Sequence, residues 1–181
     1  MWFKKIGLIL FFAGLFFLSW SAFLFWERNN PARLSFAINK TYKVPTFSAQ
    51  GQKPIRLKID SQKIDLPVFP ASLELEKWSD TKEGVSFLNS SALPGEKGNS
   101  VFYGHNWANL LGNLNKVKRG DKIEVFLEGG KKYTYYIYST SVVTPDQTHI
   151  ILPTNDTRLT IYTCTGLFDS RRFVAVAVPS L

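Results

Sequence analysis

The sequence predicts an all-β domain preceded by one N-terminal apolar helix. The first 26 residues hold three of the five Trp and seven of the fifteen Phe, with only two charges. From Pro54 onward, short β-like runs alternate with turn signals, which is typical of a β-barrel or a β-sandwich. The length of 181 residues suggests one domain, or one domain plus an appendage. The single Cys excludes an intrachain disulfide.

Residues 6–26 predict a membrane anchor that crosses the lipid bilayer once. These 21 uncharged residues would form a helix about 31 Å long, which matches a bilayer core of about 30 Å. Lys4 and Lys5 precede the run, which favours a cytoplasmic N-terminus and a folded domain on the extracellular face of the cell membrane. The alternative is a cleaved signal peptide, because small residues that suit a cleavage site lie within the run: Ser19, Ser21 and Ala22.

The rest of the chain divides into a linker and a folded domain. Residues 27–52 are polar and mixed, with Pro31 and Pro45, and we expect a linker or stalk that includes a short helix around Ala32–Ile38. Residues 53–181 are expected to form the β domain. Beyond residue 26, Lys and Arg number 20 against 14 acidic residues, a net charge of +6. This excess is scattered and lacks interleaved aromatic residues, so we expect no nucleic-acid partner.

Hairpin signals divide the domain into elements. In chain order, the expected elements are strands Ile55–Ile59 and Ile64–Val68, a short run Val101–Tyr103, a short helix Trp107–Leu114, strands Lys122–Leu127 and Tyr133–Val143, and strands Leu159–Thr163 and Phe173–Val178. The last two are joined by the loop Thr165–Ser170. Because strands outnumber helices, the pattern indicates a barrel or a sandwich.

Cys164 is the first candidate for chemistry, because it ends a β run and a rigid strand end can present a reactive group to a loop. The alternative is a buried structural Cys. A nucleophilic Cys must be a thiolate, and the unperturbed thiol has a pKa near 8.5, so a base or a cation is needed nearby. His105 follows a strand and Gly104, which makes it a better base than His149. The alternative for either His is an ordinary surface or hydrogen-bonded residue, and the sequence favours that alternative for His149.

Arg171 and Arg172 precede the last strand and are candidates for stabilising an oxyanion near Cys164. Strand alternation places only one of them inward, and periodicity does not choose between them. The alternative is a pair of solvated arginines at the strand end. Two His and one Cys that lie far apart give no zinc spacing, and no Gly-rich loop cradles a phosphate. We therefore expect no metal and no cofactor.

These residues together resemble the sortases, which are membrane-anchored cysteine transpeptidases of the bacterial surface, mostly of the Gram-positive type. The resemblance covers roughly Ile55–Val178 and rests on Gly104-His105-Asn106, Thr160-Ile161-Tyr162-Thr163-Cys164 and the Arg-Phe-Val strand that follows. Ile161 stands where Leu is usual in the family. The resemblance implies a closed eight-stranded β-barrel with short helices and with its site at the ends of two neighbouring strands.

The resemblance also implies roles for individual residues. Cys164 matches the nucleophile, His105 the general acid/base and Arg172 the family arginine, with Arg171 left open at that position or in substrate binding. Thr163 matches a residue that contacts substrate or the oxyanion. The segment Thr144–Thr157 matches the loop that lines the sorting-signal groove, and it is too short for the long helix of class B sortases.

The implied reaction is cleavage of a Leu-Pro-x-Thr-Gly-like sorting signal through a Cys thioester. The expected partners are secreted proteins that carry this signal at their C-terminus, and an amine acceptor such as a peptidoglycan precursor or a pilin Lys. Two alternatives stay open at this point. One is a thiol peptidase that hydrolyses the same signal, and the other is a non-catalytic β-barrel that binds envelope components.

Overall fold

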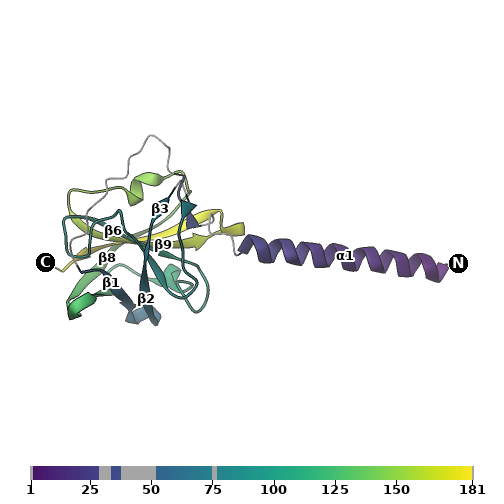
Figure 1. The fold of residues 1–181 in the computed structure, drawn as a ribbon, viewed down its shortest axis with the longest axis horizontal. Coiled ribbons are helices and arrows are strands. Elements are labelled where there is room, and N and C mark those ends of the chain that lie inside the picture. Colours follow the sequence, from purple (N-terminus) through teal and green to yellow (C-terminus); the bar gives the residue numbers. More distant parts are fainter. Residues whose placement is uncertain (1, 29–33, 38–51, 75–76, 181) are drawn as a thin grey trace. The chain divides into compact units, whose positions relative to one another are not determined.

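The computed structural model describes residues 2–28, 34–37, 52–74 and 77–180 of the chain (Figure 1). Its regular elements are one helix and ten strands: α1 Trp2–Arg28, β1 Pro54–Ile59, β2 Ile64–Ala71, β3 Leu73–Glu74, β4 Lys77–Trp78, β5 Val85–Leu88, β6 Gly98–Gly104, β7 Lys122–Leu127, β8 Lys132–Val143, β9 Thr157–Thr165 and β10 Arg171–Pro179. Short 3-10 turns connect several strands: η2 Asp60–Gln62, η3 Leu114–Lys116, η4 Glu128–Gly130, η5 Thr148–Ile151 and η6 Leu167–Asp169. Helix α1 and the strand domain are separate units of the fold.

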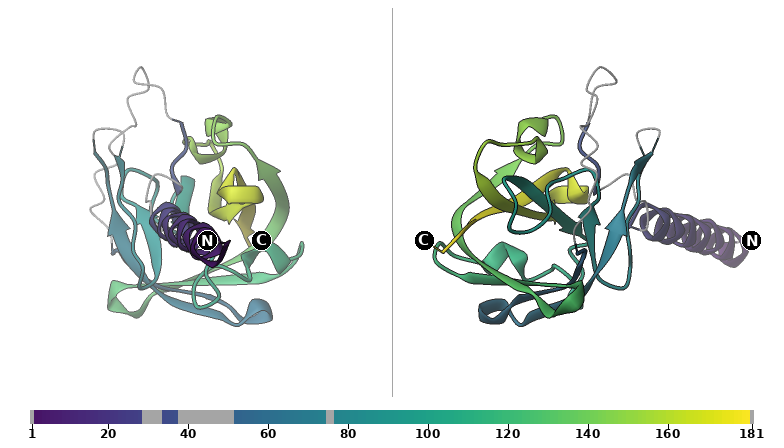
Figure 2. Two further views of the ribbon diagram at one scale, coloured as in Figure 1. Left: turned by 90° about the vertical axis from the view of Figure 1, so that its right-hand side faces the viewer. Right: turned by 60° about the vertical axis from the view of Figure 1, so that its left-hand side comes forward.

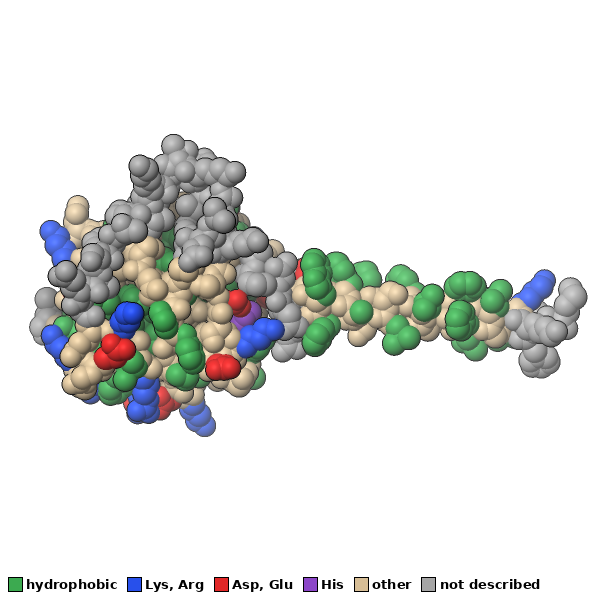
Figure 3. Space-filling view, in the orientation of Figure 1, with side chains coloured by type: hydrophobic (Ala, Val, Ile, Leu, Met, Phe, Trp, Pro, Cys, Tyr) green, Lys and Arg blue, Asp and Glu red, His purple; other side chains and the backbone are tan. Residues whose placement is uncertain are grey.

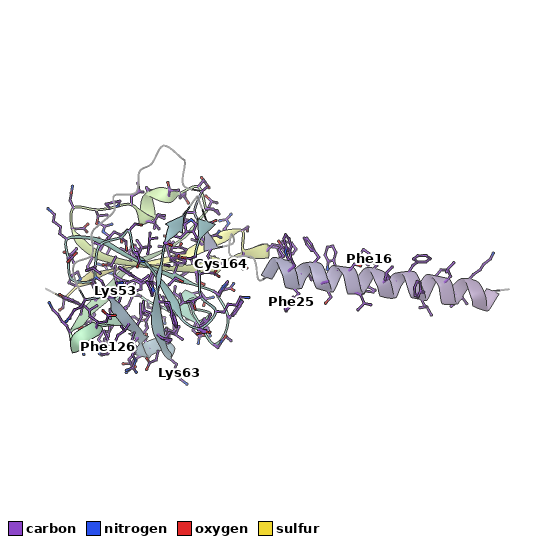
Figure 4. The ribbon with its side chains drawn as sticks, in the orientation of Figure 1. Phe16, Phe25, Lys53, Lys63, Phe126 and Cys164 are labelled. Carbon is purple, nitrogen blue, oxygen red and sulfur yellow. The ribbon has the colours of Figure 1, made fainter. Side chains whose placement is uncertain are left out.

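Helix α1 is the element that the apolar N-terminal run forms. Within it, Lys5–Glu27 is long and apolar enough to cross a membrane. Phe and Leu side chains project from the helix along its length, and charged side chains are confined to its ends (Figures 3 and 4). The predicted apolar helix is therefore present. A signal sequence has the same length and composition, so anchor and signal peptide stay alternatives.

The strand domain is a closed eight-stranded barrel, as predicted (Figure 2). The strands follow the order β1-β2-β5-β6-β9-β10-β8-β7 around the barrel, and β3 and β4 form a separate two-stranded sheet. The two predicted hairpins are confirmed as β1 with β2 and β7 with β8, and β9 also pairs antiparallel with β10. Two pairs, β2 with β5 and β6 with β9, are parallel. The second of these brings the His105 region beside the Cys164 strand.

The barrel wall is apolar on both faces where it carries β6, β9 and β10. One cluster, which includes Phe102, Ile161 and Ala175, draws on all eight barrel strands and fills the interior. Residues of the opposite parity, such as Tyr103 and Tyr162, belong to a second cluster. Because successive residues of a strand point to opposite faces, this second cluster lies on the outer face of the wall. That outer face carries the candidate site.

Two predicted helices differ from the structure. The stretch Trp107–Leu114 consists of turns that lead into η3, because Leu111 and Gly112 donate backbone hydrogen bonds to the carbonyls of His105 and Trp107 instead of forming a regular helix. Much of the helix expected at Ala32–Ile38 lies outside the described residues. Ser35–Ala37, which are described, have no regular secondary structure.

Candidate active site

Cys164 and Arg172 lie directly opposite each other on neighbouring strands. The antiparallel register of β9 and β10 pairs Cys164 with Arg172 and continues through Tyr162 paired with Val174. Paired residues on antiparallel strands project from the same face of a sheet. Both side chains are nearly buried, with 4% of Cys164 and 3% of Arg172 exposed. The register therefore brings a thiol and a guanidinium to the same part of the outer face.

His105 joins this pair from the third strand. β6 ends at Gly104, which lies opposite Thr163 in the parallel pairing with β9, so His105 comes one residue beyond, level with Cys164. Tyr103 belongs to the outer-face cluster, and by alternation the side chain two residues later points the same way. Cys164, His105 and Arg172 therefore converge from the ends of three adjacent strands, β9, β6 and β10.

Asp80 contacts His105 and was not singled out from the sequence. Its Oδ2 lies 2.7 Å from His105 Nε2, and both side chains are largely shielded from solvent. The ring of Trp107 stacks on the imidazole of His105. The two ring planes are nearly parallel, at 12°, and their centroids lie 4.4 Å apart. A carboxylate and a stacked indole together fix the plane and the hydrogen-bonded nitrogen of the imidazole. No sequence signal points to Asp80, because it lies 25 residues before His105 in an irregular segment.

The guanidinium of Arg172 is held by backbone carbonyls. Nη1 donates to the carbonyls of Asp169 and Arg171 at 2.8 and 3.0 Å, and Nη2 donates to the carbonyl of Ser35 at 2.9 Å. Its Nε is buried and has no hydrogen-bond partner among the described residues. A buried cation with one unused donor is a suitable group for binding a developing negative charge.

A short stretch of the expected linker, residues 34–37, packs on this outer face. Leu34 and Phe36 are buried in the outer-face cluster, and the Phe36 ring contacts the Tyr162 ring edge-on at 4.9 Å between centroids. Tyr162 also donates its hydroxyl to the Leu34 carbonyl at 3.1 Å. The backbone of Ala37 donates to the Pro145 carbonyl at 2.8 Å. Residues 34–37 are therefore part of the surroundings of the candidate site.

The other candidates lie in different surroundings. Thr163 is buried, and its hydroxyl donates to the Gly104 carbonyl at 2.7 Å, which ties β9 to β6; its expected contact with substrate stays a prediction. Arg171 is exposed and lies opposite Thr165, on the face of β10 that Arg172 does not share. His149 is exposed in η5, within the expected groove loop.

Two stacked tyrosines support the wall beneath the site. The rings of Tyr103 and Tyr162 lie 5.4 Å apart and nearly parallel, at 13°. Tyr103 donates its hydroxyl to the Ser79 carbonyl, which holds the segment that carries Asp80. Burial raises the pKa of both phenols well above their ordinary value of 10.0, because the phenolate would be poorly solvated there. Both groups are therefore neutral over the physiological range and support the site by packing and hydrogen bonding.

The comparisons with known proteins define the class of this fold and site. The family model of the sortase domain matches residues 57–180, so the chain belongs to the sortase family. Sortase A of Listeria monocytogenes is 31% identical to it over 120 residues, which are 62% of this chain and 53% of the relative. The chain thus spans about half the length of the curated relative that it matches.

Solved structures agree with this family. A lid mutant of sortase A from Corynebacterium diphtheriae matches with a TM-score of 0.61 and 27% identity over 74% of each chain. Sortase C-1 from Actinomyces oris matches with a TM-score of 0.58 and 29% identity, over 69% of this chain and 73% of its own. The crystal structure of the Listeria sortase A matches with a TM-score of 0.57 and 26% identity, over 72% and 88%.

Proposed function

We propose that this chain is a cysteine transpeptidase that cleaves a Leu-Pro-x-Thr-Gly-like sorting signal and transfers the acyl part to an amine. The convergence of Cys164, His105 and Arg172 on one face of three adjacent strands carries this proposal. A nucleophile, a titratable imidazole and a cation are the groups that acyl transfer requires. Membership of the sortase family and the apolar N-terminal helix support the same function.

In the proposed first half-reaction, the Cys164 thiolate attacks the carbonyl carbon of the Thr–Gly peptide bond. The C–N bond breaks as His105 gives a proton to the leaving Gly amine, and the Thr carbonyl becomes a thioester on Cys164. In the second half-reaction an acceptor amine attacks that thioester and gives up a proton to His105. The new amide leaves, and the thiolate is restored. The thiol and the imidazole end as they began, so the cycle needs no cofactor.

Arg172 is proposed to stabilise the negative charge that develops on the substrate carbonyl oxygen. Its position opposite Cys164 supports this role, and so does the buried Nε that has no hydrogen-bond partner among the described residues. Arg171 is exposed and lies opposite Thr165. We therefore assign the catalytic role to Arg172 and leave to Arg171 only a contact with substrate at the rim of the site.

The proposed partners are secreted proteins that carry a C-terminal sorting signal, together with an amine of a peptidoglycan precursor or of a pilin Lys. A membrane anchor on the extracellular face would hold the enzyme where these partners meet. Relatives of classes A and C are both among the similar structures, and either class is consistent with this proposal.

An amine-partition experiment tests the proposed function. The full chain is incubated with a peptide that contains the sorting signal, over a range of concentrations of a small amine acceptor, and the two products are measured by mass spectrometry. The proposal predicts that the amide product increases with amine concentration as the hydrolysis product decreases. Product composition that does not respond to amine would instead indicate a thiol peptidase. Absence of any cleavage by well-folded protein would indicate a non-catalytic barrel.

A further inference from the structure

We propose that Asn99 is a positioning residue for the sorting signal, because it fixes η5 to the barrel wall on the face that carries the candidate site. Asn99 lies on β6 and is 2% exposed. A buried amide is costly unless its polar atoms are hydrogen-bonded, so its place in the wall calls for a structural reason. This inference rests on the proposed function and deepens it, since it concerns how the same site binds its substrate.

The amide of Asn99 joins η5 to two strands of the barrel. Its Nδ2 donates to the carbonyls of Ile150 and Leu152, at 3.0 and 3.1 Å. Its Oδ1 accepts from the hydroxyl of Thr160 on β9, at 2.7 Å. Each polar atom of the amide therefore has a partner, and a fully satisfied buried network holds its members in one arrangement. We call Asn99 and Thr160 the clamp.

The clamp determines which side chain η5 turns toward the barrel. The two carbonyls that it binds flank Ile151, which is buried in the same outer-face cluster as Cys164. The backbone amides of Thr148 and Leu152 donate to carbonyls within the same loop. The attachment of η5 to the barrel wall therefore depends on the clamp and on apolar packing.

Residues 34–37 show that the outer face beside this loop binds a stretch of peptide. Carbonyls of this stretch accept from Tyr162 and Arg172, and the amide of Ala37 donates to the carbonyl of Pro145 in the loop that leads to η5. The sorting signal is also a peptide, and the thiol that it is proposed to reach lies on this face. We therefore expect the signal to use this surface when residues 34–37 leave it.

The distance from Cys164 to the clamp matches the length of the recognised part of the signal. Thr160 precedes Cys164 by four residues on β9 and projects from the same face, so the two positions are about 13 Å apart along the strand. β9 ends at Thr165, so the wall continues only toward Thr160. In Leu-Pro-x-Thr-Gly the Leu comes three residues before the Thr, a span of about 10 Å in an extended chain. A signal with its Thr carbonyl at Cys164 would therefore bring its Leu close to η5.

A double-mutant cycle between the chain and the peptide tests this proposal. Wild type and Asn99→Ala, each as the full chain, are given two peptides, one with the Leu of the signal and one with Ala in its place, and kcat and KM are measured. We expect wild type to prefer the Leu peptide by about tenfold or more in kcat/KM, as for an apolar side chain in an apolar pocket. Asn99→Ala should lose most of this preference through a higher KM for the Leu peptide, with kcat little changed.

Variants at two other positions are the controls. Thr160→Val removes the hydroxyl that orients the amide of Asn99 and should also lower the preference for Leu, whereas Thr160→Ser keeps a hydroxyl and should retain it. Asn113→Ala removes an amide that donates to the carbonyl of Gln62 at 3.4 Å, away from η5, and should retain the full preference. If Asn99→Ala does not fold, Thr160→Val decides the outcome.

Hydrogen exchange of the full chain measures the clamp without catalysis. The amides of residues 147–152 should exchange several-fold faster in Asn99→Ala than in wild type or in Asn113→Ala. Unchanged exchange there would overturn the inference. So would a preference for Leu that is absent from wild type or retained in both Asn99→Ala and Thr160→Val, and so would an equal loss of kcat/KM on the two peptides. Wild type that cleaves neither peptide would overturn the proposed function, and this inference with it.

Discussion

Burial distinguishes Arg172 from its neighbour in the chain, Arg171. Its side chain donates three hydrogen bonds to carbonyls near Cys164, whereas Arg171 is exposed. We expect Arg172→Lys to lower kcat/KM by about a hundredfold or more, because loss of a single oxyanion donor costs about 10²–10³ in rate. Arg171→Lys is the matched control and should change kcat/KM little. Measurement of peptide cleavage by both variants checks this, and an equal loss in the two would contradict the assignment.

Asp80 is a positioning residue in this account, because it acts on substrate only through His105. Its carboxylate orients the imidazole at 2.7 Å, so Asp80→Asn should lower kcat by about tenfold or more, within the range that general acid–base catalysis contributes, while KM changes little. The hydrogen-bonded ring N–H signal of His105 should also be lost from the proton NMR spectrum.

Two further variants test this role of Asp80. Asp80→Glu keeps the charge and should recover part of the rate. Asp156→Asn changes an exposed carboxylate that pairs with Arg158 and is the control for a general effect of charge. Normal kcat in Asp80→Asn would remove Asp80 from the account.

At the scale of elements, we expect residues 34–37 to limit access to Cys164, because Leu34 and Phe36 are buried in the same outer-face cluster as the thiol. Phe36 is buried against Tyr162, and burial of a Phe side chain is worth about 2 kcal/mol. Phe36→Ala should therefore increase the population with this segment released by about 30-fold, since 1.4 kcal/mol is a factor of ten. The rate of alkylation of Cys164 by iodoacetamide, followed by intact mass, should rise by a similar factor.

Phe126→Ala on β7 is the control for this experiment. Phe126 is a half-buried Phe that contacts Arg56 and Lys132 and lies on a strand that does not pair with β9 or β6. Its replacement should leave the alkylation rate of Cys164 unchanged. An unchanged rate in Phe36→Ala, with the fold intact, would show that residues 34–37 do not limit access to the thiol.

The separation in the chain between paired strands explains which parts of the fold the sequence could predict. The hairpins were predictable because their turns are local: Asp60–Gln62 and the Gly pair after Glu128 join strands that are adjacent in the chain. The parallel pairing of β6 with β9 joins residues about 60 positions apart, and both strands are buried on both faces, so no alternation marks their register. Short strands such as β5 lack the length to stand out.

For the candidate site, too, the sequence could predict local features but not long-range contacts. Cys164 and His105 could be selected as strand-end residues, and the resemblance already favoured Arg172. The register of β9 and β10, which pairs Arg172 with Cys164, supports that choice. Asp80 and Ser35 could not be found, because their contacts depend on irregular segments that carry no periodic pattern. Local chemistry thus selected the candidate groups, and long-range packing decided their contacts.

At the scale of the whole molecule, the stacked tyrosines predict a loss of stability in alkali. Burial raises the pKa of Tyr103 and Tyr162 above the ordinary value of 10.0, so above that pH the unfolded chain releases protons that the folded barrel retains. The free energy of unfolding should therefore be unaffected by these groups below about pH 10 and fall as the pH rises further. Urea titrations from pH 8 to pH 11 measure this directly.

Replacement of single tyrosines separates this effect from other titrations in alkali. Tyr162→Phe should make the free energy of unfolding less dependent on pH above 10, whereas Tyr136→Phe, an exposed control on β8, should not. The two variants are compared through their slopes, because Tyr162→Phe also removes the hydrogen bond to Leu34. Identical slopes in wild type and Tyr162→Phe would contradict the assigned role of burial.

Cys164 is proposed to carry the acyl group during turnover. The most direct measurement is the intact mass of the full chain, quenched in acid after mixing with a sorting-signal peptide and without an amine acceptor. We expect a mass increase equal to the acyl part of the peptide, located on Cys164 by peptide mapping and removed by hydroxylamine. Cys164→Ala should show neither the adduct nor cleavage. Cleavage that persists in Cys164→Ala, or an acyl group on another residue, would contradict the account.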